Sequence, residues 1–196
     1  MSSNPDHIIR HILRVKSGDS LPFTGWYKAT RRDLARIFAE LGYTTGAEIG
    51  VRKGTFSAIL CEAVPGLQLT CVDPWLAYER VTQNMADSLY ARAVETLAPY
   101  GVTIIKKTSL EASLIVPDAS LDFVYIDAAH DFDNVMVDIV LWSKKVRKGG
   151  IVSGHDYFNF YKAGVCWAVD AYTHAHGITN WYLTKEKEAS WFWVKT

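Results

Sequence analysis

Residues 45–73 read TGAEIGVRKGTFSAILCEAVPGLQLTCVD and decide the fold class of this chain. A short apolar run, Ala47–Ile49, ends at Gly50, and a second, Leu67–Val72, ends at Asp73. Between them, apolar residues recur at helical spacing, and glycine lets the chain turn sharply from the first strand into that helix. Continuous apolar strands alternating with helices are typical of a parallel sheet that is covered on both faces.

The same alternation continues toward the C-terminus. Further apolar runs lie at Val102–Ile105, Leu121–Ile126 and Ile151–Ser153, with helical patterns between them. Trp181–Leu183 and Trp191–Val194 are β-prone, and the short charged link between them leaves no room for a helix. We therefore predict an α/β fold: a doubly wound, mainly parallel sheet with an antiparallel C-terminal hairpin.

The residues before this sheet have a different pattern. Apolar side chains at helical spacing in residues 8–13, and a Ser/Thr-x-x-acid pattern beginning at Thr30, predict two helices. Residues 17–24 are polar and contain Gly and Pro, which predicts a loop. We expect residues 1–44 to form a helical cap and residues 45–196 the main domain.

Composition excludes several classes of protein. The chain has 196 residues, of which 49% are hydrophobic, so it can bury the core of one domain. Its 21 basic and 21 acidic residues cancel, which argues against nucleic acid as the main partner. No apolar run reaches the ~18 residues of a membrane helix, and no signal pattern begins the chain. The three cysteines are widely spaced, so we expect reduced thiols and a cytoplasmic location.

In a doubly wound sheet, ligands bind beyond the carboxyl ends of the strands. Here the first turn reads acid-x-G-x-x-x-G and lacks the G-x-G-x-x-G pattern that seats a pyrophosphate, which counts against a nicotinamide dinucleotide. Asp73 lies 23 positions after Gly50, where a carboxylate can accept the hydroxyls of a ribose. Trp75 lies beside it and could cover an adenine ring. These features predict a nucleoside cofactor.

Several stretches resemble a known family. Residues 48–54 and Asp73 look like motifs I and II of class I S-adenosylmethionine-dependent methyltransferases. Residues 121–130, 149–157 and 164–170 resemble the small O-methyltransferase-like domains related to macrolide-sugar methyltransferases and cephalosporin-hydroxylase-type proteins. The resemblance covers about residues 45–195 and implies a Rossmann-like, seven-stranded sheet with an antiparallel last strand, and S-adenosylmethionine as the cofactor. It does not extend to the N-terminal 40 residues.

The resemblance also implies roles for particular residues. Glu48, Gly50 and Gly54 would line the methionine end of the cofactor, and Asp73 would hold the ribose. Ser109 matches a small polar position near the adenine, and it is also placed to cap the helix that follows it.

Four polar residues follow the fourth and fifth predicted strands: Asp127, His130, His155 and Asp156. Methyl transfer to oxygen requires removal of a hydroxyl proton, for which His130 is the candidate base beside Asp127. Alternatively, Asp127, His155 and Asp156 could hold a divalent cation, Mg²⁺ or Mn²⁺, as the resemblance to catechol-type methyltransferases implies. The histidine weakens a Mg²⁺ site and favours Mn²⁺, Fe²⁺ or Zn²⁺. Asp127 is also predicted to bind the cofactor.

The predicted activity is O-methylation of a small hydroxylated molecule, a sugar or a natural product. Alternatives are an S-adenosylmethionine-binding protein without turnover, a nicotinamide-dependent oxidoreductase, and an RNA-binding methyltransferase relative. The basic residues occur in pairs rather than in a stripe, which favours solvated faces over an RNA surface. Acceptor specificity is expected in the loops Phe23–Ala29, Trp75–Asn84 and Phe158–Ala163, whose aromatic residues fit either a flat ligand or a homo-oligomer interface.

Overall fold

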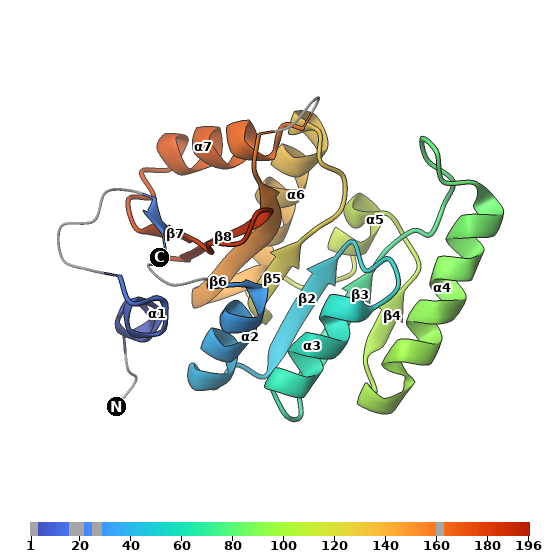
Figure 1. The fold of residues 1–196 in the computed structure, drawn as a ribbon, viewed down its shortest axis with the longest axis horizontal. Coiled ribbons are helices and arrows are strands. Elements are labelled where there is room, and N and C mark those ends of the chain that lie inside the picture. Colours follow the sequence, from blue (N-terminus) through green and yellow to red (C-terminus); the bar gives the residue numbers. More distant parts are fainter. Residues whose placement is uncertain (1–3, 16–21, 25–28, 160–162) are drawn as a thin grey trace.

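The computed structural model describes residues 4–15, 22–24, 29–159 and 163–196. Its sheet has the strand order β1-β7-β8-β6-β5-β2-β3-β4, with helices on both faces (Figure 1). The strands are β1 (Phe23–Thr24), β2 (Thr45–Ile49), β3 (Gln68–Val72), β4 (Thr103–Ile105), β5 (Leu121–Ile126), β6 (Val146–Tyr157), β7 (Trp181–Leu183) and β8 (Ala189–Val194). The helices are α1 (Pro5–Leu13), α2 (Arg31–Glu40), α3 (Thr55–Ala63), α4 (Gln83–Leu97), the short η1 (Ala98–Tyr100), α5 (Ser109–Ser113), α6 (Phe132–Lys145) and α7 (Val165–Ala175).

The predicted fold class is confirmed. Strands β2 to β6 pair in parallel, and β8 runs antiparallel to both β6 and β7. These seven strands are the predicted sheet with its C-terminal hairpin. An eighth strand, β1, pairs in parallel with β7 at the sheet edge. Its two residues fall in the predicted loop of residues 17–24, so that prediction is wrong for them. A two-residue strand is too short to show a period of its own.

Side-chain alternation divides the core into two layers. In β5, Phe123 and Tyr125 face the helices α1 to α4, whereas Val124 and Ile126 face α5 to α7. Successive residues of a strand point to opposite faces, and here both faces are apolar because helices cover both (Figure 1). All six residues of β5 are therefore buried.

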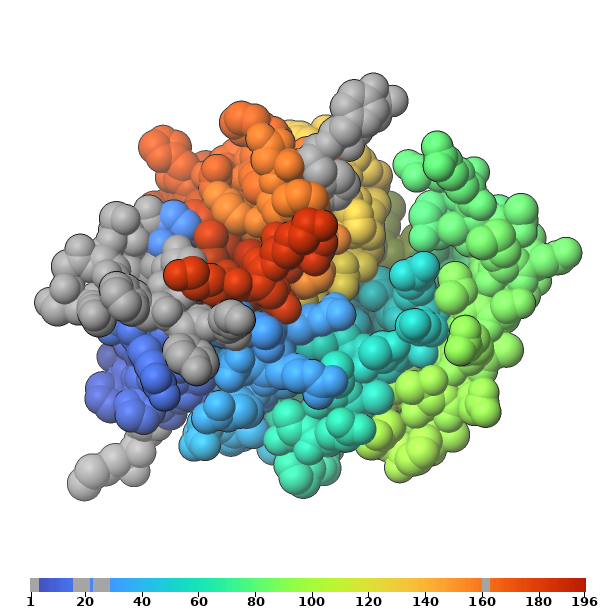
Figure 2. All heavy atoms as spheres, in the orientation of Figure 1, coloured from blue at the N-terminus to red at the C-terminus, as the bar shows by residue number. Residues whose placement is uncertain are grey.

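The N-terminal helices pack on the first of these layers. Thr30 and Asp33 form the predicted capping box at the start of α2, and Phe38 stacks on Phe123 with ring centroids 4.0 Å apart. The Tyr182 hydroxyl donates to Asp6 of α1. In Figure 2 the blue residues of α2 border the red C-terminal residues on one face. The division at residue 44 stays a prediction.

Two further features of the structure concern the cysteines and the question of membrane-spanning helices. The cysteines Cys61, Cys71 and Cys166 are free thiols. Among the described residues, no helix combines the length and the apolar character needed to cross a membrane.

Candidate functional site

The order of strands reverses at β2, which has β3 on one side and β5 on the other. The glycine turn, residues 50–54, leads from β2 into α3 at this point. Gly50 has φ 93°, and a Cβ atom there would lie 2.1 Å from the backbone oxygen of Asp127. Gly54 precedes α3 with φ 79°. The turn thus packs closely on the end of β5, and only glycine fits at position 50.

Asp73 and Trp75 connect the end of β3 to this turn. The Asp73 carboxylate accepts from the backbone N–H of Arg52 and of Trp75, both at 2.8 Å. The Trp75 ring is 3% exposed, packs against Tyr90, and donates from Nε1 to the Arg52 carbonyl at 2.7 Å. Each carboxylate oxygen keeps a further lone pair, so the arrangement is compatible with a ribose. The ribose contact of Asp73 and the adenine contact of Trp75 stay predictions, and the Trp75 ring presents no open face.

Glu48 is buried in β2 and accepts a hydrogen bond from the Ser57 hydroxyl of α3. Burial raises the pKa of Glu48 to about 8, against the opposing effect of Ser57. At neutral pH the Glu48 side chain is therefore mostly the neutral acid. Its predicted contact with the methionine end of the cofactor stays a prediction.

Ser109 is the first residue of α5, and its helix cap is Thr108, whose side chain forms a capping box with Glu111. The predicted cap is thus wrong by one residue. The Ser109 hydroxyl donates to Asp138 and accepts from Trp142 Nε1 at 2.8 Å. These contacts with α6 fix the side chain in place, and its predicted adenine contact stays a prediction.

The four polar residues predicted at the strand ends lie together, and we call them the rim cluster: Asp127, His130, His155 and Asp156. His130 Nε2 lies 3.0 Å from Asp156 Oδ2 and 3.7 Å from Asp127 Oδ1. His155 Nδ1 lies 3.2 Å from Asp156 Oδ1 and 3.9 Å from Asp127 Oδ1. Asp156 has φ 57°, at a register shift between Gly154 and Tyr157 in the pairing of β6 with β8. That irregularity directs the carboxylate toward the histidines.

The charges of the rim cluster depend strongly on one another. Asp127 and Asp156 raise the pKa of His130 to about 10, although its partial burial acts in the opposite direction. Burial alone would raise the pKa of Asp156, but His130 and His155 hold it well below its usual range. At neutral pH the cluster therefore holds an imidazolium between two carboxylates, and a protonated ring cannot accept another proton.

Three residues of the rim cluster also have the spacing of a metal site. Asp127, His130 and Asp156 each offer one ligand atom, and these three atoms lie within 4.8 Å of one another. One imidazole with two carboxylates suits Mn²⁺, Fe²⁺ or Zn²⁺ better than Mg²⁺. The sequence prediction used His155 instead of His130, and the geometry favours His130. A cleft of about 10 Å³ beside Asp127, His130 and His155 has room for about one water molecule.

Sequence reasoning missed Arg31, the first residue of α2. Its Nη1 atom lies 3.8 Å from Asp127 Oδ2, and its guanidinium carbon lies 5.2 Å from the centroid of the Phe56 ring. The N-terminal region carries no recognised motif. The one signal was the Thr30 helix cap, which fixes where α2 begins.

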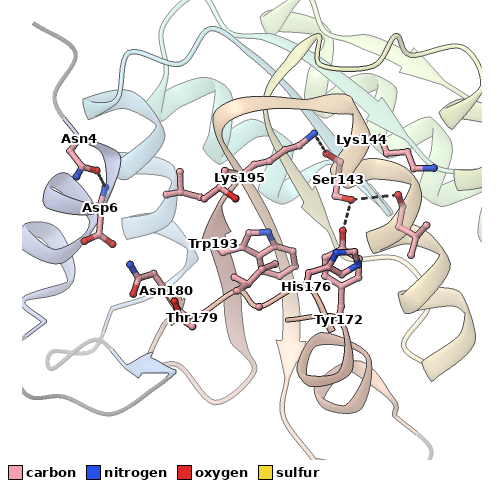
Figure 3. A pocket seen from close by; sticks show the side chains of 15 residues that line it. Asn4, Asp6, Ser143, Lys144, Tyr172, His176, Thr179, Asn180, Trp193 and Lys195 are labelled. Carbon is pink, nitrogen blue, oxygen red and sulfur yellow. Dashed lines mark hydrogen bonds between the residues drawn. The ribbon is translucent and has the colours of Figure 1, made fainter. Parts of the chain in front are cut away.

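A much larger cavity, of about 680 Å³, lies at the opposite end of the sheet (Figure 3). It is lined by the end of α6, the segment after α7 and the C-terminal residues. Tyr172 lies between His176 and Trp193 there, with ring centroids 4.2 and 5.7 Å away. No residue predicted for the site lines this cavity. Its size therefore does not mark the catalytic end of the sheet.

Residues 25–28 of the first predicted acceptor loop and residues 160–162 of the third lie outside the described residues. In the second loop, Tyr78 is 60% exposed, and its backbone bridges to Val81. The predicted role of this loop in acceptor recognition stays a prediction.

Comparison with known proteins identifies the family. The family described as "Methyltransferase domain" matches residues 47–157, more than half of the chain. No curated protein matches significantly. Solved structures that resemble this one include an O-methyltransferase from Bacillus cereus in complex with S-adenosylhomocysteine: TM-score 0.62, 14% identity, covering 100% of this chain and 92% of that one.

Two other solved structures show the same fold. The O-methyltransferase TomG from Streptomyces achromogenes, in complex with S-adenosylmethionine, has a TM-score of 0.59 and 19% identity over 85% of this chain and 80% of that one. A proposed rRNA methylase from Clostridium thermocellum has a TM-score of 0.63 and 13% identity over 85% of this chain and 95% of that one. With the family match and the glycine turn at the strand-order reversal, these findings show that the chain belongs to the methyltransferase-domain family and is a class I S-adenosylmethionine-dependent methyltransferase.

Proposed function

We propose that this methyltransferase methylates an oxygen atom of a small hydroxylated molecule, such as a sugar or a natural product. The observation that supports this most is the rim cluster beside the glycine turn, where His130 lies 3.0 Å from Asp156. A hydroxyl is a weak nucleophile until its proton is removed, and an imidazole with two carboxylates is a means of removing it.

Bound S-adenosylmethionine supplies a methyl group on a positively charged sulfur. A positive charge near the rim cluster opposes the effect of Asp127 and Asp156 on His130 and favours its neutral ring. We expect the acceptor hydroxyl to donate to His130, which takes the proton while Asp127 and Asp156 stabilise the resulting imidazolium. Because the three groups titrate together, the proton belongs to the cluster rather than to one residue.

A divalent cation is a second candidate component. The support is the approach of Asp127, His130 and Asp156 to within 4.8 Å of one another. Such a cation would lower the pKa of the acceptor hydroxyl and orient it. It would also occupy the His130 nitrogen, so His130 acts as a metal ligand or as a base, but not as both.

The test of the acceptor class is a turnover assay with a panel of molecules. Purified protein is incubated with S-adenosylmethionine and pairs of acceptors that differ only in one hydroxyl, and S-adenosylhomocysteine is measured. Product only from the hydroxylated partner of a pair is expected. Turnover only with amines or with an RNA oligonucleotide would overturn O-methylation of small molecules, as would cofactor binding without any turnover.

The test of the cation is chelation. If the metal is needed, EDTA abolishes activity and Mn²⁺ restores it more fully than Mg²⁺, and Asp156→Asn is inactive but folded. Full activity in EDTA would remove the cation from the mechanism and leave His130 as a metal-free base.

A further inference from the structure

The ion pair of Arg31 with Asp127 is long and partly open. Its atoms, Arg31 Nη1 and Asp127 Oδ2, are 3.8 Å apart, and the two side chains are 34% and 21% exposed. A hydrogen-bonded pair of charges would be about 2.7–2.9 Å apart. Among the described residues, the guanidinium has no other ion-pair partner and rests on the Phe56 ring. Both charges therefore keep capacity for a ligand.

Asp127 presents its two oxygens to different groups. Oδ1 faces His130 and His155 at 3.7 and 3.9 Å, whereas Oδ2 faces Arg31. The Oδ1 side belongs to the rim cluster. The Oδ2 side, together with Arg31, forms a separate pair of opposite charges next to the glycine turn.

This pair lies on the side of the glycine turn opposite to Asp73. Asp73 follows β3 and binds the Arg52 N–H, whereas the backbone oxygen of Asp127, at the end of β5, packs against Gly50. Neighbouring strands are about 4.8 Å apart, so the ends of β3 and β5 are separated by about 10 Å across β2. A cofactor whose ribose lies at Asp73 spans this distance with its amino-acid chain.

The spacing of the charges matches that chain end. In an α-amino acid, the ammonium nitrogen and the carboxylate oxygens are about 3 Å apart, because they are joined through one carbon. We infer that Arg31 binds the α-carboxylate of the methionine part of the cofactor, while Asp127 Oδ2 accepts from its α-ammonium group. The N-terminal region therefore supplies a cofactor-binding residue. This inference rests on the cofactor and not on the proposed acceptor.

Local structure holds Arg31 in position. The Arg31 backbone N–H donates to Glu186 Oε1 at 2.7 Å, and Thr30 with Asp33 caps the same end of α2. These contacts involve the backbone, so a side-chain substitution at position 31 leaves them in place. The guanidinium can then be removed without displacing the helix.

The test compares two ligands that differ at the amino-acid end. S-adenosylhomocysteine carries the carboxylate and ammonium groups, and 5′-methylthioadenosine lacks both. Dissociation constants for each are measured by calorimetry, or by competition for the weaker ligand, with the parent protein, Arg31→Met, Arg31→Lys and Arg32→Met. Arg32 is the exposed neighbour on α2, so Arg32→Met is a control of equal charge change.

We expect Arg31→Met to weaken S-adenosylhomocysteine binding by about 10- to 100-fold and to change 5′-methylthioadenosine binding by less than about twofold. Arg31→Lys, which keeps the charge, loses less, and Arg32→Met loses nothing. Equal loss for both ligands would make Arg31 structural, and unchanged S-adenosylhomocysteine binding would remove it from the site. Either result overturns the inference. Neither affects the proposed acceptor class, which the turnover assay tests separately.

Discussion

The two ends of the sheet differ in the volume of their cavities and in the interactions of the polar groups that line them. At the amino ends of the parallel strands lies the cavity of about 680 Å³ (Figure 3), while the carboxyl ends hold a cleft of only about 10 Å³. Polar groups at the large cavity are already hydrogen-bonded within the protein. For example, Lys195 Nζ donates to the backbone carbonyls of Ser143 and Val146 at 2.8 and 2.7 Å. The small cleft adjoins carboxylates and imidazoles that alter one another's charge.

Backbone conformation differs in the same way. Arg52, Trp75 and Asp156, all at the carboxyl end, are non-glycine residues with positive φ. Among the described residues that line the large cavity, only Gly177 has positive φ. Strained backbone persists where surrounding contacts hold it, and it collects at functional sites. Charge coupling, rather than volume, therefore distinguishes the end of the sheet where we place the chemistry, and positive φ separates the residues of the site from those that line the large cavity.

The largest expected effect compares one histidine from each end. His130→Ala should lower turnover by about 10²- to 10⁴-fold, because the group that takes the proton of the substrate hydroxyl is removed. Cofactor affinity should be retained. His176→Ala, at the exposed side of the large cavity, should leave turnover unchanged. Rates at saturating cofactor, with calorimetry for binding, measure both. A loss confined to cofactor affinity or to folding would instead make His130 a structural residue.

The second comparison uses one glycine from each end. Gly50→Ala should lower the free energy of unfolding by about 3 kcal/mol or more, because its Cβ would collide with the Asp127 backbone at a positive φ. Gly177→Ala has φ 62° but no atom within 4 Å of its Cβ, so about 1 kcal/mol is expected. Urea unfolding of both variants measures the difference. Equal losses of unfolding free energy would show that the glycine turn accommodates a methyl group as easily as an open loop does.

The third comparison uses one aspartate from each end. Asp73→Ala should weaken S-adenosylmethionine binding by about 1.5–3 kcal/mol, since it removes a charge-assisted contact to the ribose and frees two backbone N–H groups. Asp118→Ala, in the loop before β5, removes only an exposed ion pair with Lys145 and should leave affinity unchanged. Calorimetry decides, provided that melting curves show both variants folded. Parent-like affinity in Asp73→Ala would rule out the ribose contact.

The last comparison concerns pH. Because the pKa of Glu48 is raised from 4.5 to about 8, the folded protein keeps a proton that the unfolded chain releases above about pH 4.5. Glu48 therefore lowers stability progressively as pH rises from about 4.5 to 8. Glu48→Gln removes this slope, so the stability of the variant relative to the parent should rise steadily from pH 5 to pH 8. Glu40→Gln, on the exposed side of α2, should follow the parent, and a parallel curve for Glu48→Gln would show that Glu48 is charged when folded.

The sequence by itself determined the parts of this protein that depend on neighbours along the chain. The apolar runs marked β2 to β8, Thr30 marked the start of α2, and Gly50 and Asp73 marked the ends of two strands. Strand period, helix caps and glycine turns are local properties, so they can be recognised without knowing what packs against them. The strand-end acids also predicted that the rim cluster would gather, because parallel strands end at one edge.

Only the tertiary structure decided the contacts between distant segments. The pairing of β1 with β7 depends on an available sheet edge and not on the two residues themselves. The positions of β5 and β6 relative to each other bring one ligand atom each of Asp127, His130 and Asp156 within 4.8 Å of one another. Arg31 reaches Asp127 because α2 packs beside the sheet. Each of these depends on ångström-scale separations between residues far apart in the chain, which no local pattern encodes.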